Sequence, residues 1–402
     1  MDYRKLYSEI MILPVWDTHN HLDGSKYLCA QSFWDIVHYF WFVRELEGVG
    51  YPWVAEAMEM PKKERAEAFA KAFDIGRNTY WNQSLRQMLK DLWDVEITDS
   101  KSILEADERI AETGQRRGWA REVCERFSIN TITVNRISDN GLQDMEDIVC
   151  IMGGCRLPGA RQLQEIQKSS DQLTIIKQEA VKIKSHLVDL FNKGFHVLRV
   201  QPPTGVDIPE LQKSGNKIED IDEYLKHYLF RILDENKAHL QIFLGMEAPA
   251  EDYEPRTKAH RHYAVNDTRR IADIHDIFDM YSQCTFEIIN AAQLSNLDIV
   301  QAARIYPNVV PGGLWWFNFR ASTYKETMQY RLEALPATRC TLPASDARCI
   351  EWCYCKTHLV KRLLADFLWD RLERGWLDHE LAIYVAREWL YDAAARFYRG
   401  LK

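Results

Sequence analysis

The sequence predicts an α/β barrel of the TIM type, with a helical insertion after its first strand and helices at its C-terminus. Eight apolar runs alternate with amphipathic helical runs, and no Ser/Gly/Pro-rich linker or block of charge divides the 402 residues. The apolar runs are continuous, which is typical of parallel strands buried on both faces. We therefore expect one barrel domain over residues 1–402.

The predicted strands follow one another at the spacing that a parallel barrel requires. They are Ile12–His21, Thr131–Asn135, Ile148–Gly153, Phe195–Gln201, Leu240–Glu247, Thr285–Ala292, Val309–Phe317 and Cys340–Asp346. The helices predicted between and after them are Leu173–Asn192, Ile218–Glu235, Asp267–Gln283, Asn296–Tyr306, Tyr324–Leu335, Val360–Arg374 and His379–Tyr398.

An insertion rich in aromatic residues and helix formers separates the first two strands, over residues 31–120. It is too long for a simple crossover. A segment that follows the carboxyl end of a barrel strand lies on the catalytic face. We expect the insertion to form a partial lid over that face, and its aromatic residues are candidates for a homo-oligomer interface.

Composition argues against several kinds of partner. The formal charge of −8 gives no basic bias for nucleic acid, and no apolar run is long enough to span a membrane. Nine cysteines at irregular positions, with no secretory segment before the first strand, predict reduced thiols in a cytoplasmic protein. Cys349, Cys353 and Cys355 lack a zinc-binding spacing, so we interpret them as structural.

A His-x-His pair at the end of the first strand is the most informative motif, in Asp17-Thr18-His19-Asn20-His21-Leu22. Alternate strand residues point to one face, and Asp346 ends the eighth strand, which neighbours the first in a closed barrel. Two imidazoles and one carboxylate with open positions predict a catalytic site for zinc, manganese, iron or cobalt. The alternatives are a loop cap for the histidines and a helix N-cap for Asp346.

Other polar and aromatic residues lie at the same ends of the strands. Arg348 follows the eighth strand, and Arg156 and Arg199 end the third and fourth. The planar guanidinium group binds carboxylates in two hydrogen bonds, so all three are candidate substrate contacts, with salt bridges as the alternative. Trp315 and Trp316 point to opposite faces of the seventh strand, so only one can face the barrel mouth.

These dispersed motifs resemble those of the uronate isomerase family, the glucuronate and galacturonate isomerases of the amidohydrolase superfamily. The family has a D-x-H-x-H segment, a His-Tyr pair in the insertion, a Gly-rich W-W-F segment and a T-D-S-R type segment. The matching residues here are Asp17 to His21, His38-Tyr39, Gly312 to Phe317 and Ser345 to Arg348, with weaker similarity at Gly194-Phe195 and Gln241 to Gly245. The resemblance covers nearly the whole chain at low identity.

The resemblance implies an enzyme that interconverts an aldose uronate and a ketose with one metal ion, typically zinc. The implied metal ligands are His19, His21 and Asp346. The implied substrate site is lined by His38, Tyr39, Arg348, and either Trp315 or Trp316. In this interpretation Tyr39 and Arg348 handle the moving proton and the developing charge, and Asp346 takes a hydroxyl proton as the sugar ring opens. Core packing is the alternative for His38 and Tyr39.

The chain departs from the family pattern in the pocket. Leu198-Arg199-Val200 stands where the family has Ser-Asp-His, and Phe243 stands where it has His. His260 and His262 follow the fifth strand and are candidates to replace that imidazole. The helix after Arg348 carries Cys353 to His358 in place of a basic run. Sites that bind a hydroxyl discriminate strongly for it, so these changes leave the exact substrate open.

Two other functions are compatible with the same motifs. One is a metal-dependent hydrolase or decarboxylase acting on a small carboxylate-bearing substrate, with Asp346 as general base. The other is an inactive barrel kept for binding, which predicts no tightly held metal and tolerance of substitution at Asp346. Many hydrolases of the amidohydrolase superfamily use a bridging Lys or further His ligands on the middle strands. We find no matching Lys or His there in this sequence, which favours the isomerase.

Overall fold

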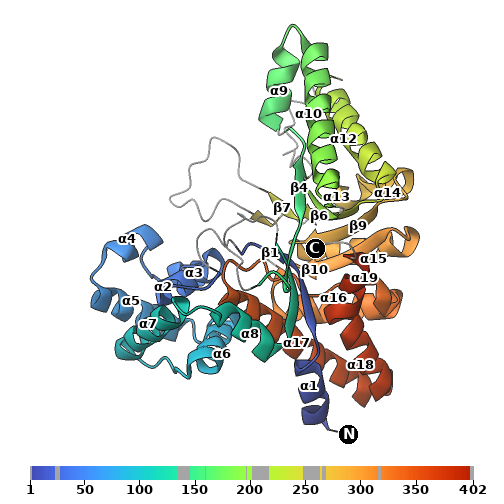
Figure 1. The fold of residues 1–402 in the computed structure, drawn as a ribbon. Helices are drawn as coiled ribbons and strands as arrows, with labels where there is room; N and C mark the ends of the chain where they lie inside the picture. Colours follow the sequence, from blue (N-terminus) through green and yellow to red (C-terminus); the bar gives the residue numbers. More distant parts are fainter. Residues whose placement is uncertain are drawn as a thin grey trace.

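The computed structural model describes residues 2–22, 28–134, 145–158, 160–195, 197–201, 217–247, 263–264, 269–315 and 318–398 (Figure 1). Every pairing among the principal strands is parallel. Those strands are β1 (Val15–Asn20), β2 (Ile129–Val134), β3 (Val149–Ile151), β4 (Gly153–Arg156), β5 (Val197–Gln201), β6 (His239–Leu244), β9 (Thr285–Asn290) and β10 (Val309–Leu314).

The strands form two sheets. Strand β3 at the edge of one sheet and β4 at the edge of the other follow each other in the chain. The strand orders of the two sheets are β1-β2-β3 and β10-β9-β6-β5-β4. Only Met152 separates β3 from β4, and its N–H donates to the carbonyl of Val134 at 2.9 Å. The predicted third strand therefore continues across both sheets. A small antiparallel pair, β7 (Met246–Glu247) with β8 (Tyr263–Ala264), follows β6.

Residues 340–347 close the barrel between β10 and β1. Thr341 donates its N–H to Pro311 of β10 at 3.1 Å. On the other side, Thr18 donates to Pro343 at 3.1 Å, and Asp346 donates to His19 at 2.9 Å. The segment lies where the eighth strand was predicted but is not a regular strand; Pro343 has no N–H to donate, and Asp346 leaves extended geometry with φ +52°.

Helices surround the barrel and build the insertion. The barrel helices and the flanking helices are α1 (Tyr3–Met11), α9 (Ala160–Lys168), α10 (Gln172–Asn192), α12 (Lys217–Glu235), α13 (Arg269–Ala272), α14 (His275–Met280), α15 (Asn296–Ile305), α16 (Ala321–Ala334), α17 (Ile350–Glu373), α18 (His379–Arg387) and α19 (Ala393–Phe397). Within the described residues, no helix is both long and apolar enough to cross a membrane.

Some helix boundaries differ from the sequence prediction. The helix predicted over 267–283 is split into α13 and α14, because the chain leaves helical geometry at Ile274 (φ −117°, ψ 7°). The C-terminal helix is interrupted by a π-helical turn over Glu388–Asp392. Helix α17 starts ten residues earlier than Val360, at Ile350. Its first eight residues are all buried, so the start lacks the polar face that marks an amphipathic helix.

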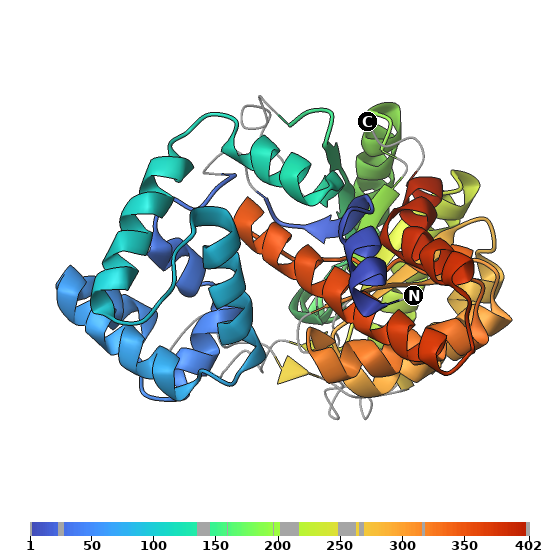
Figure 2. The same cartoon turned by 90° about the horizontal axis from the view of Figure 1, so that it is seen from below.

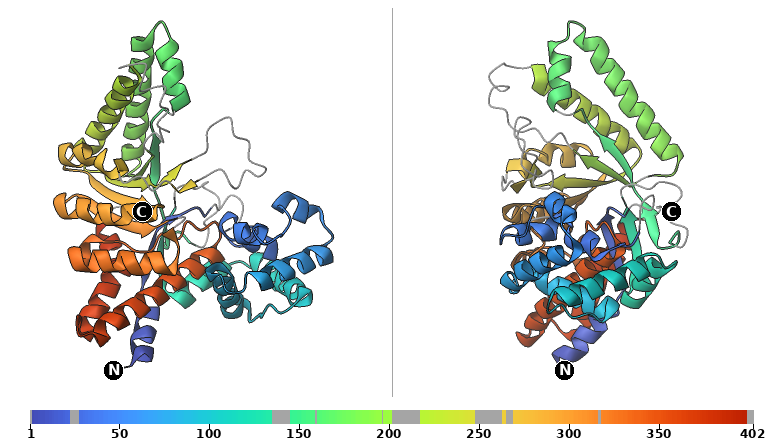
Figure 3. Two further views of the ribbon diagram at one scale, coloured as in Figure 1. Left: turned by 180° about the vertical axis from the view of Figure 1, so that it is seen from behind. Right: turned by 90° about the vertical axis from the view of Figure 1, so that its left-hand side faces the viewer.

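The insertion forms a separate group of helices beside the barrel mouth (Figures 1 and 3). Its helices are α2 (Phe33–Val37), α3 (Phe40–Glu47), α4 (Val54–Glu59), α5 (Lys62–Ile75), α6 (Tyr80–Trp93) and α7 (Ser100–Gly114). Helix α8 (Trp119–Phe127) begins before the predicted end of the insertion at residue 120 and continues beyond it to β2. Helix α17 starts beside the insertion, packs against α6 and α8, and runs across to α18 (Figure 2). It therefore joins the insertion to the barrel.

A buried polar cluster fills the barrel interior around Glu287 of β9. The Glu287 carboxylate accepts hydrogen bonds from Thr341 at 2.5 Å, from Gln241 at 3.1 Å and from the hydroxyl of Tyr398. His239 lies 3.2 Å away. Burial raises the pKa of Glu287, but the interactions with His239 and the hydroxyl donors outweigh burial and hold it below its usual value. The cluster ties the C-terminal Tyr398 to two barrel strands.

Candidate metal centre

Two histidines and one aspartate meet at the carboxyl ends of β1 and of segment 340–347. The Nε2 atom of His21 lies 2.9 Å from Oδ1 of Asp346, and Nε2 of His19 lies 3.3 Å from the same oxygen. The three ligand atoms all lie within 4.8 Å of one another. His19 and Asp346 are buried, whereas the His21 side chain is 31% exposed. The structure thus brings together the three predicted ligands.

Two of these ligands are held in the protonation state that binds metal. Burial lowers the pKa of His19 to about 4, although its hydrogen bond with Asp346 acts in the opposite direction. Burial also opposes ionisation of Asp346, but the hydrogen bonds with the two histidines hold its pKa well below the usual value. A neutral imidazole and an ionised carboxylate are the forms that coordinate metal, so the donor set fits a divalent ion.

The backbone at Asp346 is strained, and a buried network fixes it. Asp346 has a left-handed conformation (φ +52°), which costs roughly 1–3 kcal/mol in a non-glycine residue. The Asp17 carboxylate accepts the N–H of Ser345 at 2.7 Å, the Ser345 hydroxyl at 2.5 Å and Nδ2 of Asn20 at 2.8 Å. The Cys353 thiol donates to it at 3.3 Å. Asp17 therefore joins β1 and α17 to Ser345 and Asp346, which we call the ligand turn.

Phe243, Trp315 and Arg199 form the barrel wall next to His19. The ring of Phe243 lies 4.5 Å from the His19 ring and 4.9 Å from that of Trp315, between ring centres. The Arg199 guanidinium carbon lies 4.5 Å from the Phe243 ring centre. Its charge contributes to lowering the pKa of His19, after the larger effect of burial. Arg199 thus stacks on a ring that faces the predicted ligands.

Of the other residues predicted to line the site from the barrel strands and the loop after β6, Trp315 lies in the barrel and the rest fall wholly or partly outside the described residues. Trp315 is the member of the Trp pair that packs inside the barrel, and it is 2% exposed. Trp316, His260 and His262 lie outside the described residues. Arg156 ends β4, but its side chain also lies outside the described part.

His38, Tyr39 and Arg348 line one cavity of about 430 Å³, which Trp34 and Trp352 wall on the apolar side. The His38 Nε2 atom lies 2.9 Å from the hydroxyl of Tyr51, and burial lowers the pKa of His38 to about 4. The structure therefore brings together the three residues that the His-Tyr and Asp-Ala-Arg motifs supply. Residues of α2 and α4 contribute to the same cavity, so the insertion forms part of its wall.

Tyr39 links this cavity to the ligand turn. Its hydroxyl donates to the carbonyl of Asp346 at 2.8 Å and accepts a hydrogen bond from Lys356 at 2.9 Å. Lys356 lies in the stretch Cys353 to His358 that departs from the family pattern, and that pattern predicts no role for it. The contacts of Asp17 are likewise not predicted by the His-x-His motif that contains it. The available signal was a lysine that directly follows Trp352-Cys353-Tyr354-Cys355, a run of aromatic and cysteine residues.

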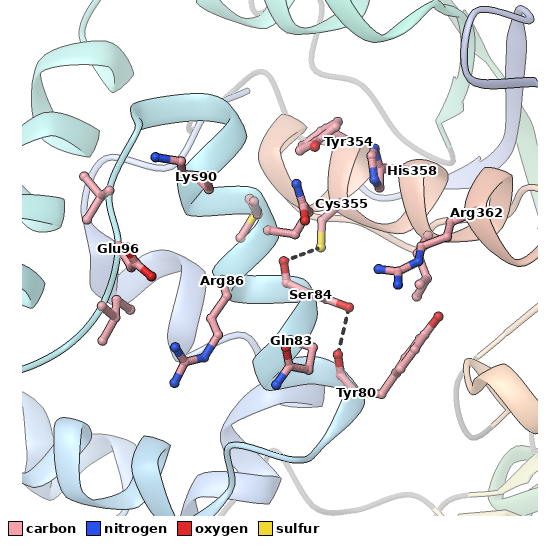
Figure 4. A pocket seen from close by; sticks show the side chains of 15 residues that line it. Tyr80, Gln83, Ser84, Arg86, Lys90, Glu96, Tyr354, Cys355, His358 and Arg362 are labelled. Carbon is pink, nitrogen blue, oxygen red and sulfur yellow. Dashed lines mark hydrogen bonds between the residues drawn. The ribbon is translucent and has the colours of Figure 1, made fainter. Parts of the chain in front are cut away.

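A second cleft, of about 310 Å³, lies between α6 and α17 (Figure 4). Tyr80 and Ser84 line it from α6, and Cys355, His358 and Arg362 line it from α17. The Cys355 thiol donates a hydrogen bond to the carbonyl of Ser84 at 3.6 Å. None of the predicted site residues lines this cleft. In the described residues, His19, His21 and Asp346 are the one group of His, Cys, Asp or Glu arranged to hold a metal.

The fold and the donor set define a TIM-type barrel with a metal-binding arrangement at the carboxyl ends of its strands, where barrel enzymes have their active sites. No protein-family model matches the sequence, and no curated protein matches it. Solved structures do share the fold over nearly the whole chain, and three of them are uronate isomerases.

The three structures come from different bacteria. A uronate isomerase from Bacillus halodurans has a TM-score of 0.76 at 16% identity, over 98% of this chain and 95% of that one. One from Thermotoga maritima has a TM-score of 0.78 at 16% identity, over 98% and 97%. A glucuronate isomerase from Caulobacter crescentus has a TM-score of 0.76 at 14% identity, over 99% and 93%. These similarities confirm the predicted fold class and the structural resemblance to uronate isomerases.

Proposed function

We propose that this chain is a metal-dependent isomerase that interconverts an aldose uronate, of the glucuronate or galacturonate kind, and the corresponding ketose. The observation that carries the proposal is the donor set of His19, His21 and Asp346 in a barrel whose structural neighbours are uronate isomerases. A bound divalent ion, zinc in this proposal, would supply positive charge that binds substrate oxygens and stabilises developing negative charge.

The residues of the 430 Å³ cavity supply binding and proton transfer. Isomerisation moves a proton between neighbouring carbons, and it requires an acid or base near each oxygen. We assign the moving proton to Tyr39 and the substrate carboxylate to the planar guanidinium of Arg348. His38, held neutral by burial, is a hydrogen-bonding partner for a hydroxyl. Asp346 takes a hydroxyl proton when the sugar ring opens.

The barrel wall would bind the other side of the substrate. Arg199 offers a second cation beside His19, and Trp315 excludes water from the barrel interior. Arg156 and Trp316 remain substrate contacts on the sequence argument alone. The insertion supplies Trp34 and other walls of the cavity, which supports its role as a partial lid. All nine cysteines are free thiols, which supports a reducing, cytoplasmic location.

The decisive experiment is proton NMR of the zinc-loaded protein with glucuronate or galacturonate in deuterated water. We expect ketose signals together with exchange of the transferred proton for solvent deuterium. Asp346→Asn, measured at the same protein concentration, is the control for contaminating activity. Unchanged spectra from a protein shown to contain zinc would reject the isomerase and favour hydrolysis or decarboxylation of a small carboxylate.

A further inference from the structure

Lys356 of α17 is a buried cation beside the ligand turn. Its residue surface is 2% exposed, and its ammonium donates to the carbonyl of Ser345 at 2.5 Å and to the hydroxyl of Tyr39 at 2.9 Å. The ring centres of Tyr39, Trp81 and Phe319 lie 4.8, 5.7 and 5.3 Å from Nζ. It forms no ion pair with a described residue. Burying an ammonium is costly, and the nearby carboxylates of Asp346 and Asp17 favour its charged form against the opposing effect of burial.

The contacts of Lys356 fix both peptide groups that flank Asp346. The Ser345 carbonyl belongs to the peptide before Asp346, and Lys356 binds it directly. The Asp346 carbonyl belongs to the peptide after it and accepts the Tyr39 hydroxyl, which Lys356 holds in turn. Fixing both peptides fixes φ and ψ of the residue between them. This is the residue with a left-handed backbone and a carboxylate aimed at two histidines.

The same contacts join three parts of the chain that are distant in sequence. Tyr39 precedes α3 of the insertion, Ser345 lies in the segment that closes the barrel, and Lys356 lies on α17. The Tyr39 ring also packs 5.2 Å from the Trp352 ring, one turn before Lys356. The ligand turn therefore cannot move without disturbing the contact between the insertion and α17.

We propose that Lys356 is a positioning residue that holds the metal-ligand turn at Asp346 and ties it to the insertion, so that metal binding and docking of the insertion are coupled. The inference rests on the metal centre of the proposed function and not on uronate chemistry. Coupling is reciprocal: whatever docking contributes to the free energy of metal binding, the metal contributes to docking.

Lys361 offers a matched control on the same helix. It is 1% exposed, and its ammonium also donates to two carbonyls, of Met11 at 2.9 Å and of Phe127 at 3.2 Å. Neither carbonyl belongs to the ligand turn or to the contact with Tyr39. Lys361→Met therefore removes a buried lysine with two carbonyl contacts and leaves the turn at Asp346 intact.

The first measurement is the zinc dissociation constant of wild type, Lys356→Met and Lys361→Met, by competition with a chromophoric chelator. We expect Lys356→Met to bind zinc about 10–100-fold more weakly, the range for residues that orient metal ligands. Lys361→Met should keep the wild-type constant, and Lys356→Arg should restore part of the loss. Equal affinity in Lys356→Met and wild type would overturn the proposal.

The second measurement is backbone hydrogen exchange over residues 33–47, with and without zinc. Zinc should slow exchange there in wild type and in Lys361→Met, but not in Lys356→Met. If wild type binds no zinc, the proposed function fails, and the zinc-free comparison then decides this inference: equal exchange in Lys356→Met and Lys361→Met would overturn it. If circular dichroism shows Lys356→Met unfolded, Tyr39→Phe replaces it, because it removes the bond to Asp346 and keeps the ring.

Discussion

Replacing Asp17 by asparagine tests whether the ligand turn is held by the network behind it. Oδ1 of Asp17 accepts the Ser345 N–H, and the amide oxygen of asparagine can keep that bond. Oδ2 accepts Nδ2 of Asn20 at 2.8 Å, and the new NH₂ group would place a donor against that donor. Losing a hydrogen bond to a charged acceptor costs about 1.5–3 kcal/mol. Neutralising a buried carboxyl whose pKa burial raises offsets part of this.

We therefore expect Asp17→Asn to lower the free energy of unfolding by about 1–2 kcal/mol. Zinc affinity should fall about 10–100-fold, the range for residues that orient a metal ligand but do not bind the metal themselves. Urea unfolding of the zinc-free protein measures the first quantity, and chelator competition measures the second. Glu287→Gln is the matched control, since Glu287 is equally buried and bonds to Thr341 of segment 340–347 but has no hydrogen bond to Ser345 or Asp346. A destabilised Asp17→Asn variant with wild-type zinc affinity would refute the reasoning.

Three further predictions concern single residues. Asp346→Asn removes the anionic ligand, so zinc binding and turnover should both be lost; normal zinc content by atomic absorption would reject its role as a ligand. Arg348→Lys should raise KM for a uronate about tenfold with kcat largely kept, because the two-bond contact with a carboxylate is lost; steady-state kinetics equal to wild type would remove Arg348 from the site. Burial lowers the pKa of Lys361 from 10.5 to about 7. The unfolded chain then binds more protons between these values, and stability should rise with pH there by at most about 5 kcal/mol. Lys361→Met should lack this rise. If the free energy of unfolding, measured with urea, changes with pH in the same way in both proteins from neutral to alkaline pH, the assignment is contradicted.

Local patterns were sufficient to predict the fold class and the three residues that meet in the candidate metal centre. Continuous apolar runs located the strands because both faces of a parallel strand are buried. The pairing of His19 with Asp346 followed from one rule, that the first and last strands of a barrel are neighbours. The hydrogen bonds of segment 340–347 to β1 and β10 satisfy that rule, although Pro343 keeps the segment from being a regular strand.

The supporting residues could not be predicted in the same way. The start of α17 is buried on all sides, so its sequence has no amphipathic period from which to place the helix. Lys356 and Tyr39 are 317 positions apart, and Asp17 and Cys353 are 336 apart. No rule of strand order links a helix side chain to a loop of the insertion. The contact of Lys356 with Tyr39 depends on how the insertion docks, and that of Cys353 with Asp17 on how α17 packs against β1; a single sequence specifies neither.

The predicted metal ligands and two groups of residues that depart from the uronate isomerase pattern lie on different parts of the barrel. The predicted ligands come from the end of β1 and from segment 340–347. Asp17 and Lys356 both form hydrogen bonds with the backbone of Ser345, next to Asp346.

Two groups of positions that depart from the family pattern, Leu198–Val200 and Phe243, lie on β5 and β6, where Arg199 stacks on Phe243. The third group, Cys353 to His358, lies on α17 behind the ligand turn. Under the proposed function, changes on β5 and β6 would alter which substrate hydroxyl groups are recognised without displacing a predicted ligand. The candidate metal centre would then be kept while the preference among sugar acids changes.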